Sequence, residues 1–307
     1  MSNTIQYASI FQQELDKQML VGATTGWMEV NSNLVKYNGG NEVKIPSILM
    51  DGLGDYDRSE GFVKGSVNMT WETHTLTQDR GRTFSIDAMD VDESNFVVTA
   101  GAIMGEFQRT KVIPEIDSYR YSKIAALAIA AEKASGGYDP AEATVLKTLQ
   151  TDIANVQDQI GEGESLVITL PFTVAAILDN NEKIQKRLDV VDFEQGGVSI
   201  KVRALDGIPI IRVPSVRLKT AYELYDGKTA GQEVGGFKAA TNAKSINWLI
   251  SSRNAPLAIS KTDTPRIFDP MTNQTAHAWK IDYRKYHDLW VPKNKLAAVF
   301  VNVKEAL

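Results

Sequence analysis

The stretch from residue 90 to residue 137 constrains the fold most, because its spacing predicts two helices that meet at Pro114. Ser94 follows three acidic residues and can cap the first helix, where the helix dipole favours negative charge. Apolar residues then recur at spacings of three and four up to Phe107. Proline removes a backbone donor and crowds the preceding turn, so we expect this helix to end or bend near Val112.

The second helix is predicted to run from Pro114 to Ser135, because proline is a favoured first residue of a helix. Gly136 and Gly137 would close it as a C-terminal cap. Its apolar side is expected to consist of Ile116, Ile124, Leu127, Ala128 and Ala131, bordered by Tyr119, Arg120 and Lys123. At about 1.5 Å per residue the helix would be about 33 Å long, which is long for a globular protein.

The composition is that of an ordinary folded protein and excludes several functions. The chain has 307 residues, of which 43% are hydrophobic and 23% are charged, and it has no cysteine, which excludes disulfides and thiolate chemistry. A net charge of −5 argues against a protein whose main task is to grip nucleic-acid phosphates. The N-terminal residues lack a signal-peptide pattern and no window reaches 18 apolar residues, so we expect no membrane contact and a cytoplasmic place of synthesis.

The chain before the helices predicts extended structure with little to cover it. Val67, Met69 and Trp71 alternate with polar neighbours, as in a strand with one apolar face. A second alternating run begins at Phe84, after an expected turn at residues 78–81. Because a two-stranded ribbon is marginal in water, another part of the fold or another copy of the chain should cover it.

A short amphipathic helix is predicted near the N-terminus, where Tyr7, Phe11, Leu15 and Met19 recur at steps of four. This apolar stripe also needs a partner.

The residues after Gly137 predict a compact mixture of helices and strands. We expect helices at 141–160 and from Pro171, strands at 166–170, 198–202, 208–213, 246–250, 257–259 and 297–303, an element from Trp279 to Trp290, and a surface loop at 214–244.

Candidate catalytic and ligand-binding motifs are incomplete. The segment 227–229 resembles the end of a phosphate-binding loop, but Tyr222 occupies the position of the required glycine. The segment 55–59 approaches a calcium loop, but Glu60 occupies the position of its glycine. We therefore interpret both segments as loops and predict no metal ligand and no cofactor.

Titratable residues give no complete catalytic set either. His74, His277 and His287 are isolated from one another and have no metal-ligand spacing. The remaining enzyme hypothesis is an acidic hydrolase that uses Asp87, Asp90 or Asp92, and it predicts a pocket around these carboxylates and loss of turnover on Asp→Asn substitution. Acidic residues before a helix already have a structural role, so we expect no enzyme activity.

The order of several short motifs resembles the major capsid proteins of tailed bacteriophages, over most of residues 5 to 303. The motifs that carry the resemblance are Gly52-Leu53-Gly54-Asp55-Tyr56-Asp57-Arg58, Gly61-Phe62, Gly65, Trp71-Glu72-Thr73, Asp79-Arg80-Gly81, Phe84-Ser85-Ile86-Asp87, Met89-Asp90-Val91-Asp92-Glu93, Glu106-Phe107-Gln108-Arg109, Val112-Ile113-Pro114-Glu115-Ile116-Asp117, Ala255-Pro256-Leu257, Ile267-Phe268-Asp269-Pro270, Tyr283-Arg284-Lys285-Tyr286-His287-Asp288 and Trp290-Val291. Residues 140 to 245 are the least diagnostic part.

The resemblance implies an α+β chain with the Hong Kong 97-type capsid fold. In that fold, residues 1–37 would be an N-terminal arm and residues 38–77 an extended β-ribbon loop that reaches over a neighbouring subunit. Residues 78–137 and 257–307 would form a peripheral domain with a long spine helix, and residues 138–256 an axial α/β domain. Such a layout explains the missing cover of the ribbon and of the N-terminal helix, because a neighbouring subunit would supply it.

The resemblance also implies a structural function. The chain would assemble with itself, as pentamers and hexamers, into an icosahedral shell around the double-stranded DNA genome of a tailed phage or prophage, in the virion after assembly in the bacterial cytoplasm. The expected partners are scaffolding and portal proteins, with sparse non-specific contact to packaged DNA because the chain is net negative. The expected contacts between subunits are Tyr7, Phe11, Leu15, Asp55, Tyr56, Arg58, Phe62, Trp71 and Arg80.

Two features of some relatives, a covalent crosslink and an N-terminal scaffolding segment, are not predicted from the residues of this chain. Lys64 lies near the expected loop tip, but no motif assigns it to the covalent Lys–Asn crosslink of some relatives, so we expect an uncrosslinked shell. The arm begins almost at Met1 without a long charged helical segment, so we expect a separate scaffolding protein or none. The alternative within the same fold is an encapsulin-type shell that holds cargo enzymes and needs no DNA.

Overall fold

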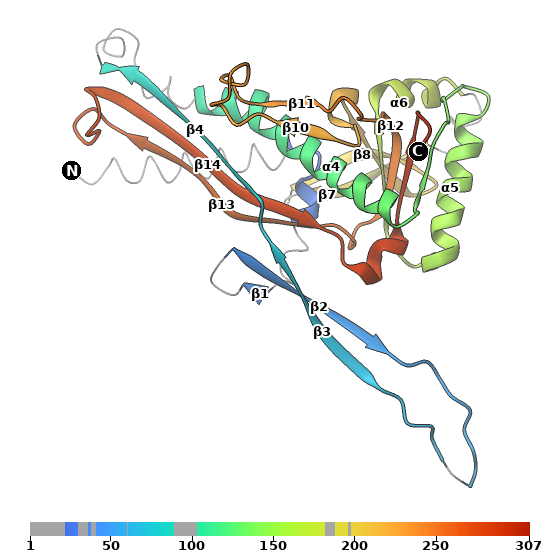
Figure 1. Cartoon of the computed structure of the whole chain (residues 1–307). Coiled ribbons are helices and arrows are strands. Elements are labelled where there is room, and N and C mark those ends of the chain that lie inside the picture. Colours follow the sequence, from blue (N-terminus) through green and yellow to red (C-terminus); the bar gives the residue numbers. More distant parts are fainter. Residues whose placement is uncertain are drawn as a thin grey trace.

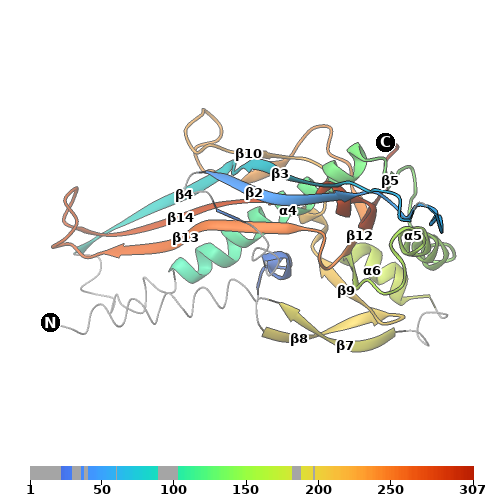
Figure 2. The same ribbon diagram turned by 90° about the horizontal axis from the view of Figure 1, so that it is seen from below.

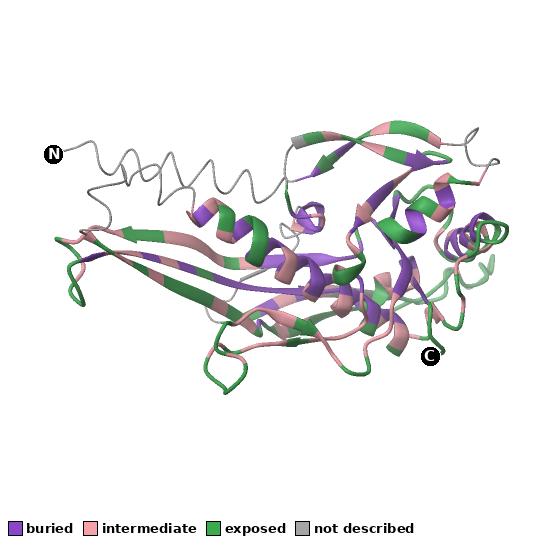
Figure 3. Cartoon of the chain, turned by 90° about the horizontal axis from the view of Figure 1, so that it is seen from above, coloured by how far each residue is buried: buried purple, intermediate pink, exposed green. Residues whose placement is uncertain are grey.

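A computed structural model describes residues 22–29, 36–37, 41–59, 61–88, 103–181, 188–195 and 198–307. Two sheets form the body and one long helix, α4, packs against both. A two-stranded ribbon projects away from this body (Figure 1). Buried residues gather where α4 crosses the sheets, whereas the peripheral loops are exposed (Figure 3).

The larger sheet has seven strands, and its central strands are buried on both faces. The strand order is β5 (Ala134–Ser135), β15 (Val299–Val303), β12 (Ile246–Ser252), β6 (Leu166–Pro171), β9 (Ile208–Val213), β8 (Val198–Leu205) and β7 (Leu188–Gln195). Every residue of β6 and β12 is buried, as continuous apolar runs predict. The strands predicted around 166–170, 198–202, 208–213 and 246–250 are confirmed, whereas β7 was not predicted.

Helices cover both faces of this sheet. Helix α5 (Val145–Ile160) and helix α6 (Phe172–Asp179) pack on one face, where Leu149 and Ile168 belong to the same core cluster. The other face packs against α4, through Ile124 and its neighbours. Strands β7 and β8 lie on the opposite side of the body from the ribbon (Figure 2).

The helical backbone is continuous across Pro114, so the helix does not end near Val112 as one of the two expected outcomes required, but its type changes at that residue. Residues 103–107 are helical, a π-helix η2 (Gln108–Val112) follows, and α4 (Ile113–Ala130) begins next to the proline. In η2 the N–H of Ile113 bonds to the carbonyl of Gln108, five residues back. One wide turn therefore absorbs the missing N–H and the bulk of Pro114 without ending the helix. Most of the helix predicted from Ser94 lies outside the described residues.

The end of α4 also differs from the prediction. The helix stops at Ala130, five residues before Ser135, and Glu132 adopts a left-handed conformation with φ of 58° in the place where glycine is usual. The N–H of Lys133 bonds to the carbonyl of Ala128 at 2.8 Å and the N–H of Glu132 to that of Ile129 at 3.1 Å, which closes the helix. Gly136 and Gly137 lie beyond this cap.

The smaller sheet has the order β13 (Leu257–Phe268), β14 (Ala278–Trp290) and β4 (Gln78–Asp87). The N-terminal half of α4 covers one face of it, where Ile113 and Ile116 pack against Ile281 and Tyr283. The turn expected at 78–81 is wrong, because these residues are the first part of β4 and pair with β14. The helix η4 (Lys293–Ala298) then leads from β14 to β15.

The segment 214–244, which was predicted as a loop, contains short elements. These are the 3₁₀-helix η3 (Ser215–Arg217) and a hairpin of β10 (Tyr222–Leu224) and β11 (Phe237–Ala239). The loop between β10 and β11 lies against β4, which contributes to the site described below.

Candidate assembly surface

The ribbon consists of β2 (Glu42–Met50) and β3 (Val67–Thr75), which pair antiparallel from Glu42↔Thr75 at its base to Met50↔Val67 at its far end. A short strand β1 (Lys36–Tyr37) pairs with the base of β2. Residues 51–66, which we call the ribbon tip, connect the two strands. The ribbon tip is the part farthest from the body (Figure 1).

One face of the ribbon base is buried against the body. Val43 and Ile45 are 0% and 3% exposed and belong to a cluster with Leu76, Leu257 and Trp290. The His74 ring, which shares this face with Val43, stacks on Trp290 at 5.5 Å. The ribbon is therefore attached to the sheet β13–β14 by an apolar base.

The opposite face of the ribbon is apolar and exposed. Directly opposite residues of paired strands share a face, so Val67 lies beside Met50, and Met69 and Trp71 continue the row. Exposed fractions are 72% for Met50, 70% for Val67, 53% for Met69 and 44% for Trp71. The predicted strand with one apolar face is confirmed.

The ribbon tip adds further exposed apolar side chains. Leu53 and Phe62 are 107% and 87% exposed, and the rings of Tyr56 and Phe62 lie 4.9 Å apart. Hydrogen bonds within the tip shape it: Asp51 accepts from the backbone N–H and the hydroxyl of Ser66, at 2.6 and 2.8 Å, which lowers the pKa of this carboxyl. Contiguous exposed apolar surface of this kind marks interaction sites.

The structure places the residues expected at subunit contacts in three regions. Asp55, Tyr56, Arg58 and Phe62 are exposed or partly exposed in the ribbon tip, apart from the body, and Trp71 lies on the exposed ribbon face. Arg80 lies instead in β4. Tyr7, Phe11 and Leu15 lie outside the described residues. All nine contacts between subunits stay predictions.

Arg80 is engaged within its own chain. Its guanidinium donates to both carboxylate oxygens of Glu115 in α4, at 2.6 and 3.2 Å, and to the carbonyl of Gly236 at 3.3 Å. It therefore links β4 to α4 and to the loop after β10. The predicted border residue Arg120 is likewise buried, at 1% exposed, and its guanidinium lies 2.5 Å from a carboxylate oxygen of Glu29.

A polar cluster around one buried carboxylate, which sequence reasoning missed, joins the ribbon to the body. Asp288 is 0% exposed and accepts hydrogen bonds from the N–H and hydroxyl of Thr77, at 3.0 and 2.8 Å, and from the Tyr119 hydroxyl at 2.6 Å. Thr77 follows the end of β3, and Tyr119 is part of α4. We call Asp288, Thr77 and Tyr119 the ribbon anchor. Its signal in the sequence is weak, because Asp288 stands between His287 and the apolar residues Leu289 and Trp290.

The electrostatics of the ribbon anchor keep the Tyr119 hydroxyl protonated. Burial raises the pKa of the Tyr119 hydroxyl strongly, and its hydrogen bond to Asp288 raises it further, so Tyr119 remains a donor at neutral pH. The Tyr286 hydroxyl donates to the carbonyl of Leu76 at 3.0 Å, beside the anchor. Directional hydrogen bonds therefore hold the two residues that connect β3 to β4.

A second buried cluster ties the segment 22–29 to α4. Asp117 is 0% exposed and accepts from the backbone N–H groups and hydroxyls of Thr24 and Thr25, at 2.7 to 3.2 Å, and from Arg217 at 3.2 Å. Burial raises the pKa of Glu29, but the charges of Arg120 and Lys285 and the hydrogen bonds from Arg120 and Ser260 together outweigh burial, so the pKa lies below its ordinary value. The chain that follows the N-terminal residues thus enters the body at a defined place.

The residues of the candidate chemical motifs that the structure describes make contacts within the chain. The N–H groups of Lys228 and Thr229, which a phosphate loop would offer to its ligand, both donate to Asp226 at 2.8 Å. These bonds lower the pKa of Asp226 to about 2. Asp87 is exposed at the end of β4, whereas Asp90 and Asp92 lie outside the described residues. Within the described ranges, no three His, Asp or Glu side chains come together as metal ligands would.

Among the described helices, none has the length and apolar character required to cross a membrane. No protein-family model matches the sequence, and no curated protein matches it.

Solved structures similar to this chain include phage capsids and a virus-like particle. The capsid structure of Staphylococcus phage Andhra aligns with 89% of this chain and 83% of its own, at 10% identity and a TM-score of 0.57. The capsid structure of the cyanophage P-SCSP1u covers 87% and 84%, at 10% identity and a TM-score of 0.56. The virus-like particle from Pyrococcus furiosus covers 96% and 99%, at 9% identity and a TM-score of 0.52.

These similarities define the class of fold: the chain has the fold of capsid shell proteins. More particularly, it is the α+β Hong Kong 97-type fold of tailed-phage capsid proteins, as the resemblance of its motifs implied.

Proposed function

We propose that this chain is the major capsid protein of a tailed phage or prophage and assembles into an icosahedral shell that encloses its double-stranded DNA genome. The observation that carries the proposal is the exposed apolar face of the ribbon, formed by Met50, Val67, Met69 and Trp71. A soluble subunit gains free energy by covering such a face, at roughly 25 cal/mol for each Å² removed from water. Another copy of the chain is the partner that a shell provides at every position.

The elements support an assignment of domains, which is part of the proposal. Residues 1–37 would be the arm, 38–77 the extended loop, 78–137 with 257–307 the peripheral domain, and 138–256 the axial domain. Strand β15, from the C-terminal range, pairs with β12 of the axial range, so the two domains would share one sheet. Shared strands would make the subunit move as a unit during assembly.

The partners follow from the same function. Pentamers and hexamers of the chain itself would form the shell in the host cytoplasm, with scaffolding and portal proteins as transient or local partners. Contact with packaged DNA would be sparse and independent of sequence, because the chain carries a net charge of −5. No catalytic residue, cofactor or metal is part of this function.

A second candidate is an encapsulin-type compartment. The specific observation in its favour is the similarity to the virus-like particle from Pyrococcus furiosus, which extends over 96% of this chain. This candidate predicts the same closed shell but a protein cargo in place of DNA.

Electron microscopy of the purified chain tests the shell function. We expect hollow closed particles, and a preparation that contains only monomers under all assembly conditions would contradict the shell function.

Deleting residues 48–65 should leave a folded, soluble subunit that no longer forms closed particles, because both the tip and part of the exposed face are removed. Normal particles from this variant would refute the role of the ribbon.

The content of native particles separates the two candidates. Particles from the host should be treated with nuclease before their contents are extracted. Protected double-stranded DNA of genome length supports the phage shell, whereas a single abundant cargo protein without DNA supports the compartment.

A further inference from the structure

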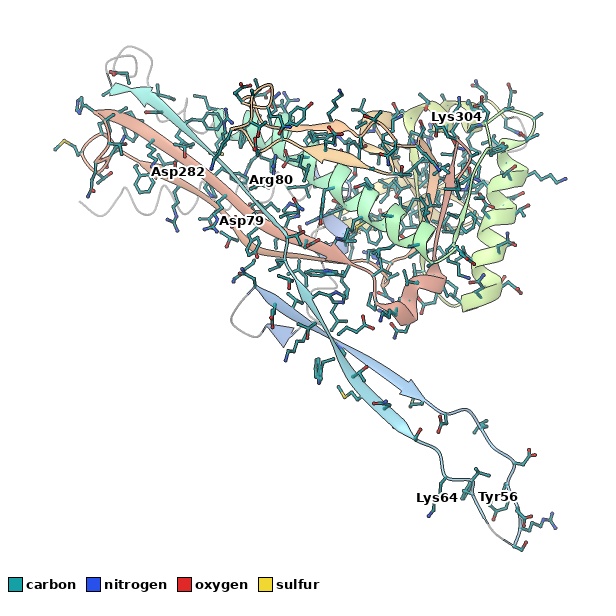
Figure 4. The ribbon with its side chains drawn as sticks, viewed as in Figure 1. Tyr56, Lys64, Asp79, Arg80, Asp282 and Lys304 are labelled. Atoms are coloured by element: carbon teal, nitrogen blue, oxygen red, sulfur yellow. The ribbon has the colours of Figure 1, made fainter. Side chains whose placement is uncertain are left out.

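A cavity of about 460 Å³ opens on the body between β4, the helical residues 107–116 and the loop 225–236. Small-molecule sites in proteins have volumes of roughly 300–1,000 Å³. Asp79 and Arg80 line the cavity and lie within the body, away from Tyr56 and Lys64 of the ribbon tip (Figure 4). The cavity is therefore separate from the exposed ribbon face on which the proposed function rests.

Three aromatic side chains form one part of the cavity, which we call the floor. The rings of Phe84 and Phe107 lie 4.9 Å apart at 75°, and those of Phe107 and Tyr283 lie 5.9 Å apart at 76°. These edge-to-face contacts hold the three rings relative to one another. A planar aromatic molecule on the floor would add a further contact of the same kind, which stabilises more than its buried area alone.

The loop that forms the opposite wall is held in place before any ligand arrives. Arg82 donates to the carbonyl of Glu233 at 3.2 Å, and its guanidinium fills the space beside Gly227 and Gly235. A Cβ on these glycines would lie 3.2 and 3.4 Å from the guanidinium, and both have positive φ, so the close approach requires glycine. A preformed wall favours binding, because little of the binding free energy is lost in ordering it.

The buried end of the cavity holds a polar side chain with an unsatisfied nitrogen. His287 lines the cavity, is 4% exposed, and its Nδ1 atom has no hydrogen-bond partner among the described residues. Burial, and after it the charges of Arg120, Lys285 and Arg80, lowers the pKa of His287 well below its ordinary value, so the imidazole is neutral at pH 7. Leaving a buried polar atom without a partner is costly. A ligand in the cavity can supply the missing hydrogen bond.

The charged groups beside His287 are already matched by carboxylates of the chain. Arg80 pairs with Glu115 at 2.6 Å, and Lys285 pairs with Asp263 at 2.5 Å. A ligand with a full charge would lose its hydration at this end without gaining an unmatched partner.

The mouth of the cavity carries both signs of charge. Arg82, Lys111 and Asp226 all line the cavity and are exposed. The Asp226 carboxylate accepts from the N–H groups of Lys228 and Thr229, at 2.8 Å each, and these bonds keep it ionised at neutral pH. A mouth of mixed charge and a buried end of matched ion pairs together favour an uncharged ligand.

A hydroxyl is the polar group that suits the buried end best. It can donate to a bare Nδ1 and can accept from a protonated one, so it matches either neutral tautomer of His287. Tyr283 and His287 are four residues apart on β14, which is about 13 Å at about 3.3 Å per residue. A molecule that contacts both side chains must therefore be longer than one benzene ring, and two fused rings meet this requirement.

We propose that the cavity is a binding site for a small, uncharged hydroxy-aromatic molecule of two fused rings, which lies on the floor and places its hydroxyl at Nδ1 of His287. Ligand binding goes beyond the proposed shell function and does not depend on it. The ligand would contact β4, the helical residues 107–116 and the loop 225–236 at once, so it would stabilise their arrangement in the folded chain.

Titration calorimetry of the unassembled full chain with 2-naphthol measures this binding. We expect one site, with a Kd of roughly 10 to 1,000 μM for a ligand of this size. Naphthalene has the same rings without the hydroxyl and should bind roughly 3 to 10 times more weakly, because it leaves Nδ1 without a partner.

The variant His287→Phe tests which side chain meets the hydroxyl. It keeps a planar ring and removes both nitrogens, so the advantage of 2-naphthol over naphthalene should disappear. The matched control His277→Phe changes an exposed histidine outside the cavity and should keep the advantage. Thermal melts establish that both variants are folded.

Amide hydrogen exchange locates the site without any substitution. At saturating 2-naphthol, peptides that cover residues 80–86, 107–116 and 225–236 should exchange more slowly, and peptides from α5 should not change. If His287→Phe does not fold, this map and the comparison of the two ligands on the unmodified chain decide.

Three outcomes would overturn the inference. They are no binding of 2-naphthol at millimolar concentration, protection confined to other parts of the chain, and an equal advantage of 2-naphthol in the unmodified chain and in folded His287→Phe. None of these measurements uses closed particles, so their failure is distinct from a failure of the proposed shell function.

Discussion

Replacing Tyr119 by Phe tests whether the ribbon anchor sets the position of the ribbon. The substitution leaves the ring, which lies 5.6 Å from the ring of His287, and removes only the hydroxyl. That hydroxyl donates to the buried carboxylate of Asp288 at 2.6 Å. Asp288 keeps its hydrogen bonds from Thr77 and from the N–H of Leu289, so the substitution removes one hydrogen bond of the ribbon anchor and leaves the others in place.

The size of the effect follows from the kind of bond. A hydrogen bond to a charged group contributes about 1.5–3 kcal/mol. Because about 1.4 kcal/mol changes an equilibrium tenfold, the opening of the chain at Leu76 and Thr77 should become roughly 10 to 100 times more populated. The body should change less, since its two main cores do not include Tyr119.

Amide hydrogen exchange of the unassembled subunit measures this opening. Peptides that cover residues 72–80 should exchange roughly 10 to 100 times faster in Tyr119→Phe than in the unmodified chain, while peptides from β6 should not change. The control is Tyr222→Phe, which removes a hydroxyl that donates to the carbonyl of Val216 at 2.6 Å, far from the ribbon. Equal exchange of residues 72–80 in both variants would refute the reasoning.

Substitutions at four further positions test other parts of the fold. Burial, reinforced by the charge of Arg120, lowers the pKa of His287 well below 6.5, so only the unfolded chain takes up a proton at this residue. As the pH is lowered from 6.5, the free energy of unfolding should therefore decrease, by at most about 1.4 kcal/mol per pH unit. His287→Gln should remove this decrease when the free energy of unfolding is measured by denaturation at several pH values. Burial raises the pKa of the Asp152 carboxyl, and Asp152→Asn removes this buried charge. The amide oxygen of the asparagine can still accept the hydrogen bonds from Trp248 and Asn302, so the melting temperature at pH 7 should stay equal or rise. Asp152→Ala removes the acceptor of both hydrogen bonds and should lower the melting temperature. Gly81→Ala would place its Cβ 2.7 Å from the carbonyl oxygen of Tyr283 and should destabilise the sheet by about 1–3 kcal/mol in chemical denaturation, while Gly163→Ala, with no atom within 4 Å, should be nearly neutral.

The parts of the fold that were predictable from sequence are those where one physical pattern acts alone. The apolar runs of β6 and β12 indicate strands buried on both faces, and they are such strands. Alternation at Val67, Met69 and Trp71 indicates a strand with one apolar face, and that face is exposed in the subunit. In each case the local pattern and the tertiary environment agree.

The predictions failed where tertiary contacts override a local signal. The residues 78–81 have the composition of a turn, but Asp79 and Arg80 are matched by Arg284 and Glu115 across the sheet and the helix, so a polar strand is stable there. Arg120 is charged and was expected at a border, but Glu29 pairs with it in the interior. Arg284, Glu115 and Glu29 all lie far in sequence from the residues that they pair with, so spacing along the chain does not predict these ion pairs.

The ribbon anchor also failed to appear in the sequence analysis, and its chemistry explains why a shell subunit would use it. Apolar contacts hold a ribbon to a body but are non-directional, so the cluster around Val43 and Ile45 alone would leave its angle loosely defined. The bonds from Thr77 and Tyr119 to Asp288 have preferred lengths and directions, and they therefore define that angle. In a head-to-tail ring, an error in the angle of one subunit is repeated at every contact and prevents closure. In the proposed shell, a well-defined angle would allow each contact between subunits to be modest, because closure makes the contacts act together.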